Sequence, residues 1–199
     1  TKTDDLIKSG YLSKFRIKVL LCDHAPQYFE SYHDEMEYLV GHKGRNNLIK
    51  NLVNDLKGNT LVLFNYVEKH GEPLYELINN TIDPERKLFF VHGATDVEDR
   101  EEVRQITETE SNAIIVASYG TFSTGINIKR LHNIVFASPS KSRIRNLQSI
   151  GRVLRKGEGK DIATLYDIAD DIGGQNYTLK HLNERVNIYN DENFKYEVI

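Results

Sequence analysis

The sequence predicts an α/β fold in which a mainly parallel central sheet is flanked by helices. Two observations support this prediction. Five short runs are largely apolar, as expected for parallel strands that are buried on both faces. These runs alternate with segments of helical periodicity, which is the pattern of βαβ units in one doubly wound sheet. The five runs are Thr60–Phe64, Lys87–Val91, Ala113–Ala117, Asn133–Ala137 and Ala163–Asp167.

Three segments precede these runs. Phe15–Cys22 alternates and then becomes fully apolar, which favours a strand that enters a core. Residues 27–41 are mixed and aromatic, and we interpret them as an irregular or helical connector. Residues 45–56 carry leucine, isoleucine and valine at helical spacing before Gly58, which predicts a helix that ends at this glycine.

Helical patterns also follow the runs. The predicted helices lie at residues 68–80, 97–108, 142–155 and 178–189. Thr95-Asp96-Val97-Glu98 has the spacing of a capping box before the second of them. The tail after Asn190 is expected to be loose. We divide the chain into a linker with an initial strand and the first helix (1–57), a core (58–175), and a C-terminal helix with its tail (176–199).

The composition is that of an ordinary globular protein. The 199 residues allow one large domain or one domain with appendages, and 39% of them are hydrophobic and 28% charged. The single cysteine, Cys22, excludes an internal disulfide framework and a cysteine-based zinc site. No apolar run approaches the roughly 20 residues that span a bilayer, and no signal peptide opens the sequence. We therefore expect an intracellular protein without a membrane partner.

Charge is distributed unevenly along the chain. Residues 129–160 contain nine basic residues and one acidic residue, a net charge of +8, so the remainder carries −11 of the total of −3. A basic segment in an acidic protein favours a local, phosphate-rich partner. A solvated basic face is the alternative interpretation.

The most informative stretch lies within this basic segment, at Gln148–Arg155. Gln148, Arg152 and Arg155 stand at positions i, i+4 and i+7, so in a helix they form a polar stripe beside an apolar one. Gly151 interrupts the helix at a cost of roughly 1 kcal/mol relative to alanine, which a purely structural helix has no need to bear. Two planar guanidinium groups beside an amide suit a nucleotide phosphate that gains charge during transfer.

Loops that follow three of the runs contain small polar residues. In parallel sheets, ligands bind at the carboxyl ends of the strands, where these loops lie. Asn65 and Tyr66 follow the first run, and residues 92–95 follow the second. Ser118–Asn127 follows the third and places hydroxyl residues between two glycines, which suits contacts to phosphates. A flexible connector is the alternative interpretation.

Several acidic residues are interpreted as structural. Asp34-Glu35 does not follow an apolar strand, so we do not assign it to a metal. Asp167, Asp170 and Asp171 are interpreted as residues at the end of a strand. The seven histidines show no ligand spacing, which argues against a metal hydrolase.

These motifs resemble those of superfamily-two helicases. Gln148–Arg155 is similar to motif VI, Q-x-x-G-R-x-x-R, Ser118–Asn127 to motif V, and Thr60–Tyr66 to motif IV. His92-Gly93, with Thr95 and Arg100, is similar to the His-Gly…Arg element between motifs IV and V. The resemblance covers residues 58–170. It implies the second RecA-like domain of such a helicase, a three-layer fold with a mainly parallel sheet.

The resemblance also implies roles for particular residues. Arg155 corresponds to the arginine finger that reaches the γ-phosphate of ATP, and Arg152 assists it. The residues implied on the nucleotide side are Gln148, Gly125 and Asn127. Many relatives have aspartate where Asn127 stands, so any ribose contact here lacks the charge. The residues implied in nucleic-acid binding are Ser118 or Thr121, Asn65, Gly93 and Thr95.

The sequence lacks the other half of an ATP site. It contains no G-x-x-x-x-G-K-[ST] loop: Asp161 follows Gly159-Lys160, and Leu154 stands where the first glycine is needed. The resemblance therefore implies that ATP and Mg²⁺ bind between this domain and an upstream RecA-like domain, which holds most of the Mg²⁺ coordination. We expect the fragment alone to be inactive.

The expected substrate is single-stranded or branched DNA, in recombination, replication or repair. The similarity to recombination helicases of phages favours DNA over RNA and places the protein in the host cytoplasm. Two other functions are considered. A non-catalytic nucleic-acid-binding module explains the basic segment but not the stripe around Gly151. A Rossmann-type enzyme is disfavoured because no G-x-G-x-x-G follows a strand.

Overall fold

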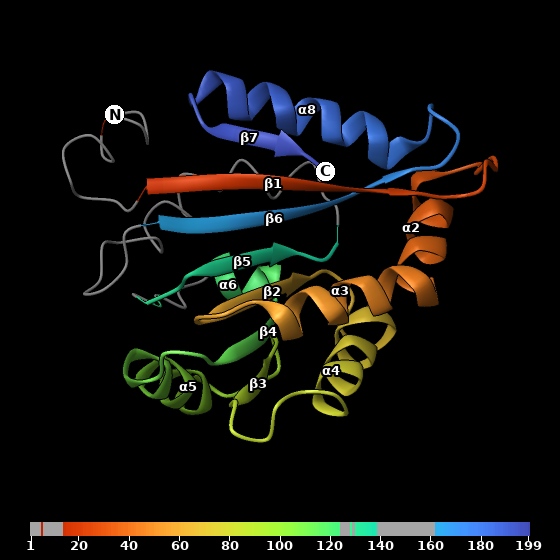
Figure 1. The fold of residues 1–199 in the computed structure, drawn as a ribbon. Helices are drawn as coiled ribbons and strands as arrows, with labels where there is room; N and C mark the ends of the chain where they lie inside the picture. Colours follow the sequence, from red (N-terminus) through yellow and green to blue (C-terminus); the bar gives the residue numbers. More distant parts are fainter. Residues whose placement is uncertain (1–4, 6–13, 124–127, 129, 139–161) are drawn as a thin grey trace.

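The protein is a three-layer α/β domain built on one seven-stranded sheet (Figure 1). The computed structural model describes residues 5, 14–123, 128, 130–138 and 162–199. The sheet order is β3-β4-β2-β5-β6-β1-β7, and every pair of strands in the described part is parallel. The strands are β1 (Lys14–Asp23), β2 (Thr60–Phe64), β3 (Leu88–Val91), β4 (Ile114–Ser118), β5 (Asn133–Phe136), β6 (Ile162–Asp171) and β7 (Lys195–Val198). The predicted fold class is confirmed.

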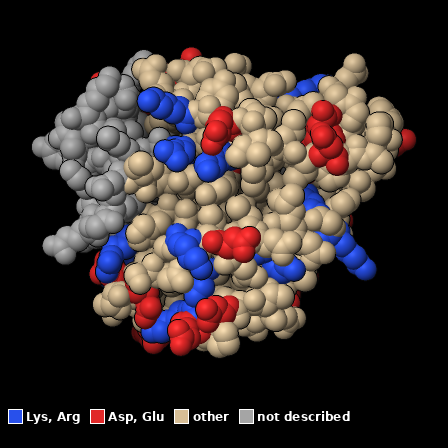
Figure 2. Space-filling model, in the orientation of Figure 1, with Lys and Arg blue, Asp and Glu red and all other residues tan. Residues whose placement is uncertain are grey.

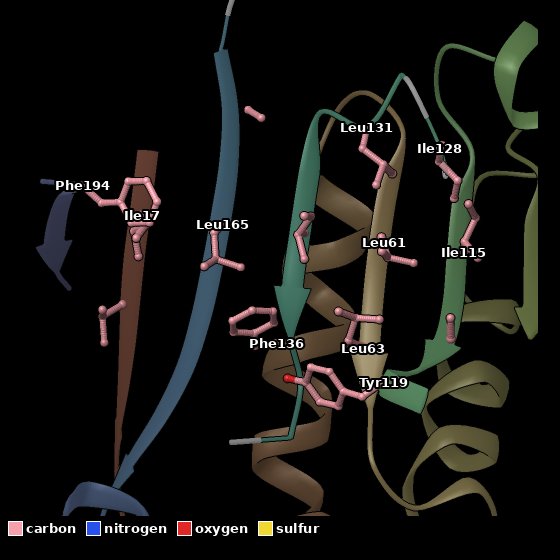
Figure 3. Packing of buried hydrophobic residues seen from close by; sticks show 14 of the residues in the cluster. Ile17, Leu61, Leu63, Ile115, Tyr119, Ile128, Leu131, Phe136, Leu165 and Phe194 are labelled. Atoms are coloured by element: carbon pink, nitrogen blue, oxygen red, sulfur yellow. The ribbon is translucent and has the colours of Figure 1, made fainter. Parts of the chain in front are cut away.

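Helices cover both faces of the sheet. On one face, α3 (Lys43–Asp55) and α4 (Glu72–Asn79) pack on a cluster that includes Ile49, Val62 and Leu74. On the other face, the cluster in Figure 3 is completed by α5 (Val97–Thr109), α6 (Tyr119–Ser123) and α8 (Tyr177–Asp191). Successive residues along each strand pack alternately into the two clusters, which is why the runs are largely apolar.

The connector at residues 27–41 contains a helix. Ser31 caps the helix α2 (Tyr32–Val40) by accepting a hydrogen bond from the Asp34 N–H group. Met36, Leu39 and Val40 pack with Ile172 in a third, smaller cluster at the carboxyl ends of β1 and β6. The helical interpretation of this segment is therefore confirmed.

The predicted helix at 68–80 begins with a turn of π-helix, η1 (Val67–Gly71), and continues as α4. A Cβ atom at Gly71 would lie 2.5 Å from the Phe64 ring, so glycine allows this turn to approach β2 closely. Such turns inside helices are frequent at functional sites. The predicted helix at 142–155 lies outside the described residues.

Three expectations for the local structure were wrong. The tail after Asn190 forms β7, which pairs with β1, because Tyr196 packs on the first cluster. Asp96 is the N-cap of α5 and makes no side-chain cap bond, whereas the Thr95 hydroxyl accepts from the His92 N–H group, so no capping box forms. Asp167 lies inside β6 rather than at the end of a strand, whereas Asp170 and Asp171 are the last two residues of β6, as predicted. Asp167 and Asp170 are both fully buried.

Candidate functional site

Those predicted site residues that the structure describes lie at the carboxyl edge of the sheet. Phe64 at the end of β2 is in register with Ser118 at the end of β4, and Leu63 is in register with Phe136 of β5. Asn65 therefore leaves the sheet beside Ser118, and Ser138 follows two positions after β5. This edge is where parallel sheets bind ligands.

Ser118 and Thr121 form one unit. Their hydroxyl oxygens lie 2.7 Å apart, and the Thr121 N–H group donates to Ser118 Oγ over 3.3 Å. This arrangement follows from α6 beginning directly after β4, so that the expected long loop starts as a helical turn. Both side chains are buried, whereas Gly120 between them is exposed. A ligand at this edge would meet the backbone of this turn first.

Asn65 lies in the turn between β2 and η1. Its N–H group donates to Ser138 Oγ over 3.2 Å. Its Oδ1 atom is buried and has no hydrogen-bond partner among the described residues. Buried oxygen acceptors are usually satisfied, so this oxygen is an exception, although the Asn65 residue as a whole is only partly buried.

Gly93 and Thr95 lie in the turn between β3 and α5. The Thr95 hydroxyl accepts a hydrogen bond from the His92 N–H group. The Thr95 carbonyl accepts one from Arg100 Nε over 2.9 Å. Space around Gly93 is open, since a Cβ atom there would meet nothing within 4 Å. The Thr95 side chain thus stabilises the turn, and Gly93 leaves its backbone accessible.

The residues predicted to contact the nucleotide and its transferring phosphate lie outside the described part of the chain; they are Gly125, Asn127, Gln148, Arg152 and Arg155. Their roles stay predictions.

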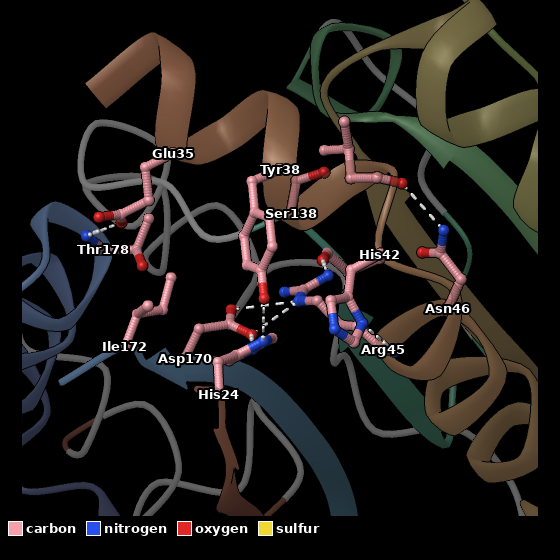
Figure 4. A network of polar contacts seen from close by, with 12 residues as sticks. His24, Glu35, Tyr38, His42, Arg45, Asn46, Ser138, Asp170, Ile172 and Thr178 are labelled. Atoms are coloured by element: carbon pink, nitrogen blue, oxygen red, sulfur yellow. Dashed lines mark hydrogen bonds and ion pairs between the residues drawn. The ribbon is translucent and has the colours of Figure 1, made fainter. Parts of the chain in front are cut away.

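Sequence reasoning missed a buried polar network at this edge (Figure 4). Arg45 Nε contacts both carboxylate oxygens of Asp170, at 2.9 and 3.1 Å, and Arg45 Nη1 donates to the Ala137 carbonyl over 2.6 Å. His24 Nε2 lies 2.8 Å from Asp170 Oδ1. Burial by itself would raise the pKa of Asp170, but Arg45 and His24 outweigh it and lower that pKa.

The second missed group surrounds Asp167. Its Oδ2 atom accepts from Arg185 Nε over 2.8 Å and from the Tyr189 hydroxyl over 2.6 Å. Burial, with the Asp167 carboxylate, raises the pKa of Tyr189 well above its ordinary value. Two carboxylates within an apolar strand are the sequence signal that could have revealed both groups, because buried charges require partners.

Both aspartates are therefore held by arginines from helices. This occupation explains them as structural residues. The Asp167 Oδ1 atom is buried and has no hydrogen-bond partner among the described residues. Within the described residues, no group of three or more metal-ligating side chains is present, and no helix is long and apolar enough to cross a membrane.

A comparison with protein families supplies the decisive observation. The model of the helicase conserved C-terminal domain matches residues 44–157, more than half of the chain. The chain belongs to this family. The match includes both the Ser118–Thr121 unit and the Gln148–Arg155 stretch.

Individual relatives of this helicase domain agree. The chain is 35% identical to the ATP-dependent DNA helicase uvsW of Enterobacteria phage T4, over 98% of this chain and 42% of that protein. The crystal structure of T4 UvsW matches with a TM-score of 0.79 and 36% identity, over 94% of this chain and 41% of that chain. The chain thus spans less than half the length of this curated relative.

A more distant structure shows the same fold. The ATP-dependent Type ISP restriction-modification enzyme LlaBIII bound to DNA matches with a TM-score of 0.63 and 15% identity, over 100% of this chain and 16% of that chain. The seven-stranded sheet is accordingly that of a RecA-like helicase domain, as the sequence motifs predict.

Proposed function

We propose that this chain is the second motor domain of an ATP-dependent DNA helicase that acts in recombination, replication or repair. The observation that carries this proposal is the helicase-domain match over residues 44–157, which contains the arginines of motif VI. The similarity to the phage T4 helicase over nearly the whole chain favours DNA as the substrate. Host cytoplasm is the location that follows.

The ATP site would be shared with an upstream RecA-like domain of the same polypeptide. In the described part of this domain, the carboxylates buried in β6 are already bound to Arg45 and Arg185, so they do not suit Mg²⁺. Mg²⁺ would therefore be held mainly by the other domain. Gln148, Gly125 and Asn127 would line the nucleotide side of the cleft on this domain.

Arg155, assisted by Arg152, would stabilise the transferring phosphate. Phosphoryl transfer spreads negative charge over three oxygens, and a guanidinium group placed against them is worth about 10³-fold or more in rate. Nucleic acid would contact the backbone amides and hydroxyls at the carboxyl edge of the sheet, around Ser118, Thr121 and Asn65. Such contacts bind phosphates without reading the base sequence.

Substitution of Arg155 tests this function in the polypeptide that carries both RecA-like domains. We expect Arg155→Ala to reduce DNA-stimulated ATP hydrolysis by about 10³-fold or more, with DNA affinity changed much less. Lys156→Ala is the matched control, because it removes a positive charge one position outside the stripe. Equal turnover by the two variants would contradict the assignment of Arg155.

A non-catalytic nucleic-acid-binding module is the alternative, and the net charge of +8 on residues 129–160 favours it. That function predicts binding that weakens steeply with salt and no nucleotide dependence. ATP hydrolysis measured in parallel with binding separates the two functions.

A further inference from the structure

Ser138 is a junction between segments that are distant in sequence. Its side chain is fully buried, and the Asn65 N–H group and the His70 ring both contact its Oγ atom, at 3.2 and 2.9 Å. The Tyr119 hydroxyl donates to its carbonyl over 3.0 Å. Ser138 thus joins the turn after β2, the π-helical turn η1 and the start of α6.

The direction of these hydrogen bonds can be derived. Asn46 Nδ2 donates to the Val40 carbonyl, so Asn46 Oδ1 is the acceptor that faces His70 Nε2, over 3.1 Å. His70 therefore carries its proton on Nε2, and its Nδ1 atom accepts from the Ser138 hydroxyl. Burial, and then the positive charge of Arg45, lower the pKa of His70 to about 3, which keeps this ring neutral.

Because the Ser138 hydroxyl donates a hydrogen bond to His70, the lone pairs of its Oγ atom face the Asn65 N–H group. The hydroxyl is then used as donor and as acceptor at once, and rotation about its Cβ–Oγ bond is restricted. The Asn65 backbone is held in place, while its Oδ1 atom lacks a partner in the described structure. The turn is fixed, and the Asn65 residue as a whole is only partly buried.

We propose that Ser138 is a positioning residue for nucleic-acid binding. Its hydroxyl holds the turn after β2 so that the Asn65 amide faces the bound strand, and its carbonyl ties the Ser118–Thr121 unit to the same point through Tyr119. This inference rests on the proposed function, because it assumes that a nucleic-acid strand lies along this edge of the sheet.

The test compares Ser138→Ala with Thr60→Val in the polypeptide that carries both RecA-like domains. Thr60→Val is a matched control: it also removes a buried hydroxyl that makes hydrogen bonds, at the opposite end of β2. The probe is a single-stranded DNA oligonucleotide. The readouts are its dissociation constant by fluorescence anisotropy and the concentration that half-maximally stimulates ATP hydrolysis.

We expect Ser138→Ala to raise both concentrations about 3- to 10-fold, the effect of one or two net hydrogen bonds, and to leave kcat at saturating DNA within about twofold. Thr60→Val should leave both concentrations unchanged. Ser138→Cys, whose thiol is somewhat larger than the hydroxyl but forms only weak hydrogen bonds, should resemble the alanine variant and serves if that variant is unstable. Equal effects of the serine and threonine variants would overturn the proposal.

An Asn65→Ala background supplies a second, independent criterion. If Ser138 acts through the Asn65 amide, Ser138→Ala should weaken binding less than twofold further once that amide is gone. A full additive loss would refute the positioning role. Absence of stimulated ATP hydrolysis in the wild type would instead contradict the proposed function, and the anisotropy comparison would still decide the role of Ser138.

Discussion

At the scale of single residues, this domain buries titratable groups that its fold must satisfy. His70 is fully buried and engages both ring nitrogens, with Ser138 on one side and Asn46 on the other. Asp170 and Arg45 form a buried pair with Arg45 Nη2 left without a partner in the described part of the chain. Removing one partner of such a pair typically costs about 3–5 kcal/mol, because the other charge is left uncompensated.

The His70 environment predicts a pH dependence of stability. Its folded pKa of about 3 lies below the ordinary value of 6.5, so only the unfolded chain takes up its proton between these pH values. The corresponding stability is complete above about pH 6.5 and is lost as pH falls toward 3. This group alone should lower the free energy of unfolding by about 2 kcal/mol from pH 7 to pH 5.

Denaturant titrations at these two pH values check the prediction. His70→Gln should abolish this component of the decline, whereas His33→Gln, which replaces a largely exposed histidine of α2, should retain it. A decline of the same size in His70→Gln would show that another group causes it.

At the scale of elements, α2 is attached to α8 through one carboxylate. Glu35 is fully buried, and its two oxygens accept from the Tyr177 and Thr178 N–H groups over 2.9 and 2.6 Å. Asn176 Nδ2 donates to the same side chain over 3.3 Å. The first turn of α8 is thus capped from another helix, and the negative charge complements the helix dipole.

Glu35→Gln should therefore destabilise the domain. One acceptor oxygen becomes an NH₂ group, which leaves buried N–H donors without a partner at a cost of about 1–3 kcal/mol. The adjacent Asp34 is exposed, so Asp34→Asn should cost less than about 1 kcal/mol. Midpoints of thermal or urea unfolding would measure both, and equal losses would argue against the capping role.

At the scale of the whole molecule, the distribution of charge bears on the proposed phosphate contacts. Figure 2 shows acidic and basic side chains interspersed over one face of the described structure, without a single-sign surface there. Of the nine basic residues in the +8 segment at residues 129–160, only Arg130 lies within the described residues. The proposed phosphate contacts therefore depend on this segment and on the carboxyl edge of the sheet rather than on overall charge, since the chain carries a net −3.

The purified 199-residue chain should not hydrolyse ATP, with or without DNA. It has no phosphate-binding loop, and the two buried carboxylates of β6, Asp167 and Asp170, are bound by arginines. Phosphate release measured over a range of chain concentrations tests this expectation, with Arg155→Ala as the comparison. Turnover that is proportional to chain concentration and disappears in Arg155→Ala would contradict it.

Local pattern was sufficient for most of the fold. Largely apolar runs predicted β2 to β5, and helical periodicity predicted α3, α4, α5 and α8. A strand buried on both faces and a helix buried along one stripe each leave a pattern in residues that are close in sequence. Motif order also placed Asn65 and Ser118 at one edge, since parallel strands end on the same side.

What the sequence determined by itself is therefore the fold class, the family and the candidate site at the carboxyl edge. Only the tertiary structure decided the partners of the buried polar groups. Arg45 and Asp170 are 125 positions apart, and His70 and Ser138 are 68 apart, so no local periodicity connects them. The edge strand β7 likewise depends on its pairing with β1. A strand order and a buried charge pair are properties of packing, and they become defined only when distant segments meet.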